Sequence, residues 1–137
     1  LTIRGAGGVQ NFVVNMVSGA TTLNMLSWQF SLWTGGTDLI TVNGSTGNDT
    51  IIVSSQHTIF DGGAGSDTVD YSSWGGGFTL TLNTSNWVNA VWNSGLFDTF
   101  RNVENVTGSA DADTITGDSA NNALSGAGGN DVINGGA

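Results

Sequence analysis

Four aspartates stand in short glycine-rich segments whose composition suits a metal ion. Each occupies the sixth place of a nine-residue segment that begins with glycine, and they are Asp49, Asp67, Asp113 and Asp131. Carboxylate and carbonyl oxygens are the ligands that calcium prefers, and one ion requires about six to eight of them. One six-residue turn supplies fewer oxygens than that, so a second turn must complete each site.

The spacing of these segments indicates which turns meet. Their opening glycines lie eighteen residues apart within each of two pairs: Gly44 and Gly62, Gly108 and Gly126. If each nine-residue segment runs once across the width of a solenoid, the chain returns to the same edge after two segments. Neighbouring turns would then stack at roughly 4.8 Å, the usual distance between paired strands. We therefore expect two good cation sites, with Asp49 opposite Asp67 and Asp113 opposite Asp131.

The same period of nine continues beyond these four segments. Segments 44–52, 62–70 and 126–134 share glycine at places one and four, aspartate at place six and an aliphatic residue at place eight, and segments 108–116 and 117–125 continue the frame. Glycines at places one, two and four permit a positive φ in the turn. Places seven to nine form a short strand whose middle side chain enters the core. This pattern predicts an all-β protein with essentially no helix, a right-handed parallel β-roll or β-solenoid.

The eighth place predicts the core. The nine-residue period can be extended into the first third of the chain if only an apolar residue at the eighth place is required. This extension skips one residue near Thr34. We expect the following eighth-place side chains to be buried: Val14, Leu23, Leu32, Val42, Ile51, Val69, Ile115, Leu124 and Ile133.

The pattern is interrupted in the middle of the chain. Between about residues 71 and 106 the motif is lost, and the alternation of residues 78–83 indicates a half-buried strand. We therefore expect four parts: degenerate solenoid coils (1–34), a first block of repeats (35–70), an irregular segment of inserted strands and loops (71–106) and a second block (107–137). The second block is expected to continue beyond residue 137.

The edge of the coil opposite the two good pairs is expected to bind ions poorly. The turns of residues 35–40 and 53–58 lack an acid at the sixth place. The turns of Glu104, Asn122 and Gly135 together offer one carboxylate and one amide. At most one or two weak sites are expected there.

The charge balance excludes several classes of partner. The 137 residues include 11 acids and 2 arginines but no lysine, for a formal net charge of −9. Nucleic acids and anionic membranes need a positive patch that replaces their counterions, so divalent cations are the expected partners instead. Cysteine is absent, which excludes disulfides and thiolate metal sites. No apolar run reaches the roughly 20 residues of a membrane span.

Catalysis is not expected from these residues. His57 is the sole histidine, and we interpret it as an exposed spacer in a turn, because a zinc cluster would need further histidine or cysteine ligands. The acids already belong to the cation pattern. The tryptophans either fill the core of a widened coil or form a surface for sugar stacking or self-association, and they are Trp28, Trp33, Trp74, Trp87 and Trp92.

Residues 35–137 resemble the RTX, or haemolysin-type, calcium-binding repeat family, whose nonapeptide is G-G-x-G-x-D-x-U-x. The segment from Phe97 to Asp118 is similar to the inserted-strand-then-repeat segments of large secreted members. The resemblance implies a parallel β-roll, Ca²⁺ as the bound ion, type I secretion from a bacterium and folding on meeting extracellular calcium. The protein would then be secreted or held at the cell surface.

The resemblance also implies a ligand set. It comprises the sixth-place carboxylates and backbone oxygens of their turns, within Gly44, Thr46, Asn48, Asp49, Gly62, Ala64, Ser66, Asp67, Gly108, Ala110, Asp111, Ala112, Asp113, Gly126, Gly128, Asn130 and Asp131. Some repeats depart from the motif and are expected to bind less tightly or not at all. In these, Ser45, Ser109 and Asp111 replace glycines, and Asn122 replaces an acid.

Three functions remain open. The first is a calcium-dependent structural and secretion module of a larger protein. The second is an adhesive or self-assembling surface-layer or filament protein with a calcium-stabilised solenoid. The third is the non-catalytic C-terminal part of a secreted hydrolase whose catalytic domain lies outside these residues. The repeats are compatible with each of these parents and do not choose between them.

Overall fold

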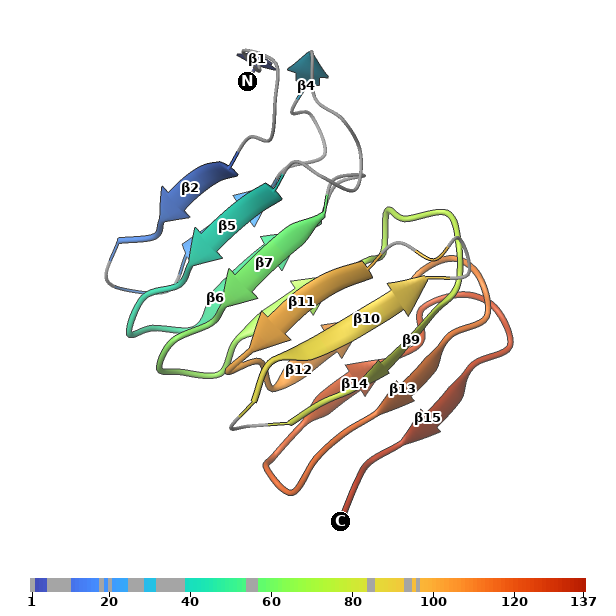
Figure 1. Ribbon diagram of the computed structural model, residues 1–137. Coiled ribbons are helices and arrows are strands. Elements are labelled where there is room, and N and C mark those ends of the chain that lie inside the picture. Colours follow the sequence, from blue (N-terminus) through green and yellow to red (C-terminus); the bar gives the residue numbers. More distant parts are fainter. Residues whose placement is uncertain are drawn as a thin grey trace.

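The computed structural model describes residues 2–4, 11–17, 19, 21–24, 29–31, 39–53, 57–83, 86–92, 95 and 97–137. Every regular element of these residues is a β-strand, and the strands form two large sheets and one small one (Figure 1). The same residues contain no helix with the length and apolar character that a membrane span requires. The predicted all-β class is confirmed.

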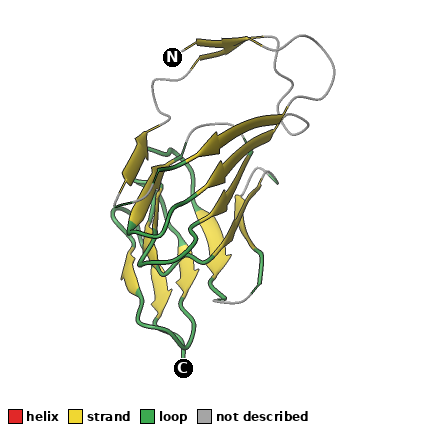
Figure 2. Ribbon diagram, turned by 90° about the vertical axis from the view of Figure 1, so that its left-hand side faces the viewer, coloured by secondary structure: helices red, strands yellow, loops and turns green. Residues whose placement is uncertain are grey.

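The larger of the two main sheets has eight strands. In spatial order they are β15 (Val132–Asn134), β13 (Thr114–Thr116), β9 (Phe78–Thr81), β10 (Val88–Trp92), β11 (Phe97–Arg101), β7 (Thr58–Asp61), β5 (Leu39–Asn43) and β2 (Asn11–Asn15). The other main sheet has five strands, in the order β14 (Ala123–Ser125), β12 (Asn105–Thr107), β8 (Thr68–Asp70), β6 (Asp49–Ile52) and β3 (Thr21–Asn24). Apart from these sheets lies a parallel pair, β1 (Thr2–Arg4) and β4 (Gln29–Ser31) (Figure 2).

Successive strands of the repeats alternate between the two main sheets, and each pairs in parallel with a strand one full coil away. Ile51 pairs with Val69, so eighth-place residues lie side by side on neighbouring coils. Eighth-place residues of the first third of the chain lie in the same rows, because Val14 pairs with Val42 and Leu23 pairs with Ile51. The predicted parallel β-roll is confirmed.

Most eighth-place side chains form the core between the sheets. Four are wholly buried: Val42, Ile51, Val69 and Ile115. Three more are partly buried and pack against the core: Val14, Leu23 and Leu124. The prediction is wrong for Ile133, which is 46% exposed because β15 is the end strand of its sheet and has no neighbouring coil to cover it. Leu32 lies outside the described residues.

The inserted segment is more regular than predicted. It supplies β9, β10 and β11 to the eight-stranded sheet, where β11 pairs in parallel with β7 and β9 pairs in parallel with β13. The strand between them, β10, is antiparallel to both, so this sheet is not parallel throughout. In the five-stranded sheet β8 pairs directly with β12. The insertion therefore widens one sheet and leaves the other continuous.

Aromatic side chains fill the space beside the added strands. Tyr71, Phe78, Trp92 and Phe100 are buried, and the ring centroid of Tyr71 lies 4.5 Å from that of Phe78. Trp74 packs on Trp92 at 4.2 Å between centroids. Two of the tryptophans therefore belong to the core of the widened coil. Two others lie outside the described residues: Trp28 and Trp33.

Trp87 and His57 lie nearer the surface. Trp87 is 45% exposed, and the guanidinium of Arg101 lies 4.5 Å from its ring centroid. His57, which we expected to be an exposed spacer, is half-buried, and burial lowers its pKa. That expectation is wrong because the chain before β7 packs on the preceding coil, where the His57 carbonyl accepts a 3.0 Å hydrogen bond from the Ile40 N–H.

Candidate calcium sites

The turns of the roll lie along two edges. What we call the first edge carries the turns that lead into the five-stranded sheet, at residues 44–48, 62–67, 102–104 and 117–122. The second edge carries turns that lead into the eight-stranded sheet, including residues 71–77, 108–113 and 126–131.

The two predicted pairs of aspartates lie at opposite edges, the earlier pair at the first edge and the later pair at the second. Glu104 and Asn122, which we expected on the edge opposite the good pairs, instead follow Asp67 along the first edge. The expectation holds for the later pair, Asp113 and Asp131, and is wrong for the earlier pair, because Gly62 and Gly108 are separated by about five nonapeptides. Each nonapeptide takes the chain from one edge to the other, so after an odd number of them the turns of Asp113 and Asp131 lie on the second edge.

At the first edge, the turns of Asp49 and Asp67 are hydrogen-bonded to each other. The Asp49 N–H donates to Oδ1 of Asp67 at 2.7 Å, and the Ala64 N–H donates to the Ser45 carbonyl at 3.2 Å. Both aspartates are wholly buried. The predicted pair is therefore in direct contact through backbone and side-chain groups.

The second edge repeats this arrangement in a different part of the chain. The Asp113 N–H donates to Oδ1 of Asp131 at 3.0 Å, and the Gly128 N–H donates to the Ser109 carbonyl at 3.0 Å. Asp113 is 2% exposed and Asp131 is half-buried. The same turn-on-turn geometry thus arises twice from the same sequence spacing.

The leading turn of each pair satisfies its own carboxylate. The Ser45 N–H donates to Oδ2 of Asp49 at 2.5 Å, and the Ser109 N–H donates to Oδ2 of Asp113 at 2.7 Å. The Ser109 hydroxyl also donates to Oδ1 of Asp113 at 3.1 Å. These serines stand where the motif has glycine, and at Asp113 the serine hydroxyl adds a donor to the carboxylate that glycine would not supply.

The trailing turn of the first pair differs. Gly63 has a φ of 93°, and Oδ2 of Asp67 is buried with no hydrogen-bond partner. Burial, together with the nearby carboxylates of Glu104, Asp49 and Asp61, raises the pKa of Asp67 to about 6. A buried carboxylate oxygen without a donor, surrounded by other acids, is the environment that a bound cation would stabilise. The residues present therefore fit a calcium ion.

The glycines at place one are needed for space rather than for unusual backbone angles. We expected a positive φ at this place, but none of the five has one: Gly44, Gly62, Gly108, Gly117 and Gly126. A Cβ on Gly108 would lie 2.5 Å from Oδ2 of Asp113 and 2.6 Å from the carbonyl oxygen of Gly126. The absent side chain thus leaves room where a carboxylate and a carbonyl of the facing turn converge.

The other residues of the implied ligand set line the turns. The exposed members are Thr46, Asn48, Ala64, Ser66, Ala110, Asp111, Ala112 and Asn130. Asn48 helps to join the turns, because its side-chain oxygen accepts a 2.9 Å hydrogen bond from the Ser66 N–H. Within the described residues, no three histidine, aspartate or glutamate side chains gather closely enough to hold a metal. Backbone carbonyls must therefore supply most of the oxygens, which calcium accepts.

Asp98 is a buried acid that our sequence analysis did not single out. Its Oδ1 accepts a 2.8 Å hydrogen bond from the Thr58 N–H, as Asp67 does from Asp49, so it takes the sixth place of the inserted coil. Its Oδ2 accepts a 2.8 Å hydrogen bond from the Tyr71 hydroxyl, which makes it a core residue. The available signal was the spacing of Asp98 and Phe100, which repeats the D-x-U part of the motif without its glycines.

Asp118 was also missed. Its N–H donates to Oδ1 of Asn122 at 2.9 Å, and its own Oδ1 accepts a 3.0 Å hydrogen bond from the Ala120 N–H. Its Oδ2 is buried with no hydrogen-bond partner. Asp118 stands at place two, where the motif has glycine, so the motif gave no reason to choose it.

Comparison with known proteins agrees with this geometry. A family model of the RTX calcium-binding nonapeptide repeat matches four copies, in residues 34–69 and 107–137. Both hydrogen-bonded pairs of turns lie within these two segments. No curated protein matches the chain. Through residues 34–69 and 107–137, this chain belongs to the RTX calcium-binding nonapeptide-repeat family.

Proposed function

We propose that this chain is a calcium-binding β-roll module of a larger secreted bacterial protein and that it folds on meeting extracellular calcium. The observation that carries the proposal is the recurrence of one turn-on-turn arrangement at two edges of the roll, each time with a sixth-place carboxylate against the facing backbone. RTX repeats are a calcium-binding structural module, and the ligand chemistry of these turns agrees with that role.

In this proposal the carboxylates of Asp49, Asp67, Asp113 and Asp131 hold the ions, together with backbone carbonyls of their turns. Bound calcium supplies positive charge between stacked acidic turns. The chain itself positions the oxygens, because the Asp49 and Asp113 N–H groups orient the facing carboxylates. Metal binding then contributes directly to the free energy of folding.

The charge of the chain supports a role outside the cell. The formal net charge is −9, so electrostatic repulsion between the acids opposes folding of the calcium-free chain. Extracellular calcium modules have dissociation constants of about 10⁻⁴ to 10⁻³ M, so their sites are empty at cytosolic calcium and filled outside. The chain would remain loose before type I export and become ordered afterwards.

Calorimetric titration with calcium chloride tests the proposal directly. We expect binding in the millimolar range and a higher melting temperature in calcium than in chelator. At ten times the dissociation constant, each site should add about 1.4 kcal/mol to the free energy of unfolding. Magnesium chloride is the control, because magnesium retains its water and fits carbonyl-lined turns poorly. Absence of millimolar binding, or identical melting curves with and without chelator, would contradict the proposal.

A further inference from the structure

The three-residue turn between β11 and β12 is a shortened form of the repeat turn. The connection from β7 to β8 uses residues 62–67, whereas the connection from β11 to β12 uses only residues 102–104. The two ends of the longer turn are nevertheless preserved. A Cβ added to Gly62 would clash with the carbonyl oxygen of Asn102. In the same way, a Cβ added to Gly44 would clash with the carbonyl oxygen of Gly62. Asn102 therefore stands in for the glycine at place one.

Glu104 stands in for the acid at place six. Its Oε2 accepts a 2.8 Å hydrogen bond from the Asp67 N–H, as Oδ1 of Asp67 does from the Asp49 N–H. Its own N–H donates to the Asp67 carbonyl at 3.1 Å. The longer side chain of glutamate compensates for the missing residues of the turn. The column of acids thus continues across the insertion from Asp49 to Asp67 to Glu104.

Oxygen atoms of the two turns converge beside Gly62. A Cβ on this residue would lie 2.5 Å from Oδ2 of Asp67 and would also meet the Asn102 carbonyl. Asp67 is wholly buried, and this Oδ2 has no hydrogen-bond partner. An unpartnered buried carboxylate oxygen beside a carbonyl calls for a cation, and the Glu104 carboxylate is hydrogen-bonded to the backbone N–H of the same aspartate.

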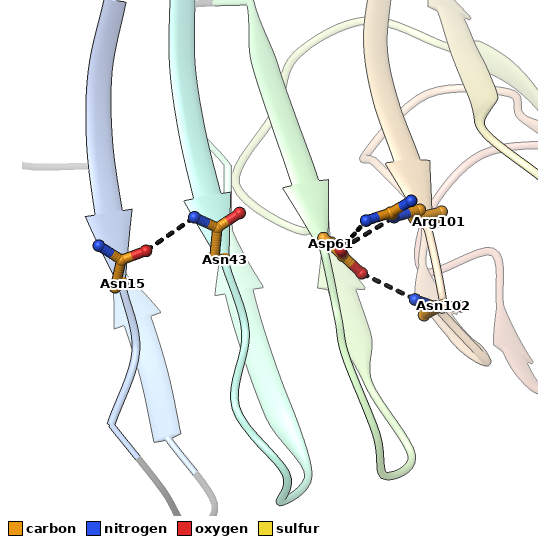
Figure 3. A network of polar contacts seen from close by, with 5 residues as sticks. All are labelled: Asn15, Asn43, Asp61, Arg101 and Asn102. Atoms are coloured by element: carbon orange, nitrogen blue, oxygen red, sulfur yellow. Dashed lines mark hydrogen bonds and ion pairs between the residues drawn. The ribbon is translucent and has the colours of Figure 1, made fainter.

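The shortened turn is fixed in place by contacts outside this cluster. Asn102 has a φ of 52°, a conformation that asparagine tolerates better than most residues. Its side-chain N–H donates to Oδ1 of Asp61 at 2.8 Å, and Arg101 Nε donates to Oδ2 of the same carboxylate at 2.8 Å (Figure 3). The carbonyl of Asn102 is therefore held towards Gly62 by contacts within the protein.

We propose that Asp67, Asn102 and Glu104 form an additional calcium site, which ties the inserted strands to the first block of repeats. The site rests on the proposed function, since it uses the same ion. Two of its three residues, Asn102 and Glu104, lie outside the repeat motif, because the match to the RTX model ends at residue 69 and resumes at residue 107. Two carboxylates and the Asn102 carbonyl supply ligands for it, in keeping with the oxygen preference of calcium.

Glu104→Gln distinguishes a ligand from a hydrogen-bond acceptor. Glutamine retains an oxygen that can accept from the Asp67 N–H but lacks the charge, so the turn should fold. Titration of the whole chain with calcium chloride should show one ion fewer, or one class of sites weakened at least tenfold. The matched control is Asp70→Asn, because Asp70 accepts a local 2.8 Å hydrogen bond from the Ser72 N–H and takes no part in the proposed site. It should bind calcium as the unaltered chain does.

Glu104→Asp provides a second test if the glutamine variant folds poorly. It keeps the charge but is shorter by one methylene, so it should also lose the additional site. Tryptophan fluorescence in saturating calcium reports whether each variant folds. Unchanged stoichiometry and affinity in a folded Glu104 variant would overturn the additional site while leaving the proposed function intact. Absence of calcium binding by the unaltered chain would overturn both.

Discussion

The hydroxyl of Tyr71 donates a 2.8 Å hydrogen bond to Oδ2 of Asp98 inside the core. The other oxygen of Asp98 accepts from the Thr58 N–H at 2.8 Å, so one carboxylate joins β7, β11 and the chain that follows β8. Burial raises the pKa of Asp98 to about 7, and burial and Asp98 raise the pKa of Tyr71 well above its usual range. The insertion is thus attached to the first block by a group that titrates near neutral pH.

Asp98→Asn should change how the free energy of unfolding depends on pH. Because the pKa of Asp98 rises from 3.8 to about 7 on folding, the folded chain holds this proton more tightly than the unfolded chain. The resulting stabilisation is complete below pH 3.8 and is lost as the pH rises to about 7. Asparagine does not titrate, so the variant does not lose this stabilisation. Its free energy of unfolding, measured in urea, should therefore rise relative to that of the unaltered chain between pH 3.8 and about 7.

The comparison isolates Asp98, since other acids titrate equally in both chains. Asparagine can still accept from the Thr58 N–H and can pair with the Tyr71 hydroxyl, so the variant should retain its fold. Tyr71→Phe is the control, because it keeps the charge and removes one donor, and it should steepen the loss of stability with pH. A stability difference between the unaltered chain and Asp98→Asn that is constant from pH 4 to 8 would show that Asp98 titrates normally.

Gly62→Ala should destabilise the roll even though glycine has an ordinary φ there. A Cβ would meet the Asn102 carbonyl and lie 2.5 Å from Oδ2 of Asp67, so backbone atoms must move. We expect a loss of about 1 to 3 kcal/mol in the free energy of unfolding, as overpacking typically causes. Gly75→Ala is the matched control, because nothing lies within 4 Å of its Cβ position, and it should change stability by less than about 0.5 kcal/mol. Equal effects of the two substitutions in urea unfolding would contradict this account.

The sequence predicted the parts of the fold that follow from an uninterrupted period. Within each block no residue is inserted, so eighteen-residue spacing was sufficient to place Asp49 beside Asp67 and Asp113 beside Asp131. The eighth-place rule failed at Ile133, because burial there depends on a neighbouring coil rather than on the residue itself. Local pattern therefore specifies the strand and its inward face but not whether another strand covers it.

Long-range features around the insertion could not be predicted in the same way. The strand order β9–β10–β11 depends on β11 returning to pair with β7 across some 40 residues of chain, which no local pattern indicates. Asp98 was missed for this reason, since its sixth-place role exists only once β11 lies beside β7. The exchange of edges between the two blocks follows from the five strands β8 to β12, whose turns within residues 71–106 carry no repeat motif.

Arg101→Met should weaken the attachment of β11 to β7 by a modest, salt-dependent amount. The guanidinium pairs with Asp61 and lies over Trp87, but the Arg101 side chain is 44% exposed, so solvent screens the ion pair. We expect a loss of about 0.5 to 1 kcal/mol at low ionic strength. Urea unfolding at 1 M sodium chloride should reduce the difference. If salt leaves the difference unchanged, the ion pair contributes nothing and the loss comes from packing.

Asp131→Ala should abolish calcium binding at the second edge more completely than any other single substitution there. Its Oδ1 accepts from the Asp113 N–H at 3.0 Å, whereas the carboxylate of Asp113 is already occupied by the Ser109 N–H and hydroxyl. Asp131 is therefore the carboxylate of this pair whose charge is more available to an ion. Alanine removes both the charge and the acceptor, so stability in chelator should fall as well.

Asp131→Asn separates these two contributions. Asparagine retains an oxygen for the Asp113 N–H and lacks only the charge, so its stability in chelator should match that of the unaltered chain. Its calorimetric titration should still lose one ion or show one class of sites weakened at least tenfold. If Asp131→Asn binds calcium normally and Asp131→Ala does not, Asp131 acts by holding the facing turn in place, and the ion at the second edge does not need its charge.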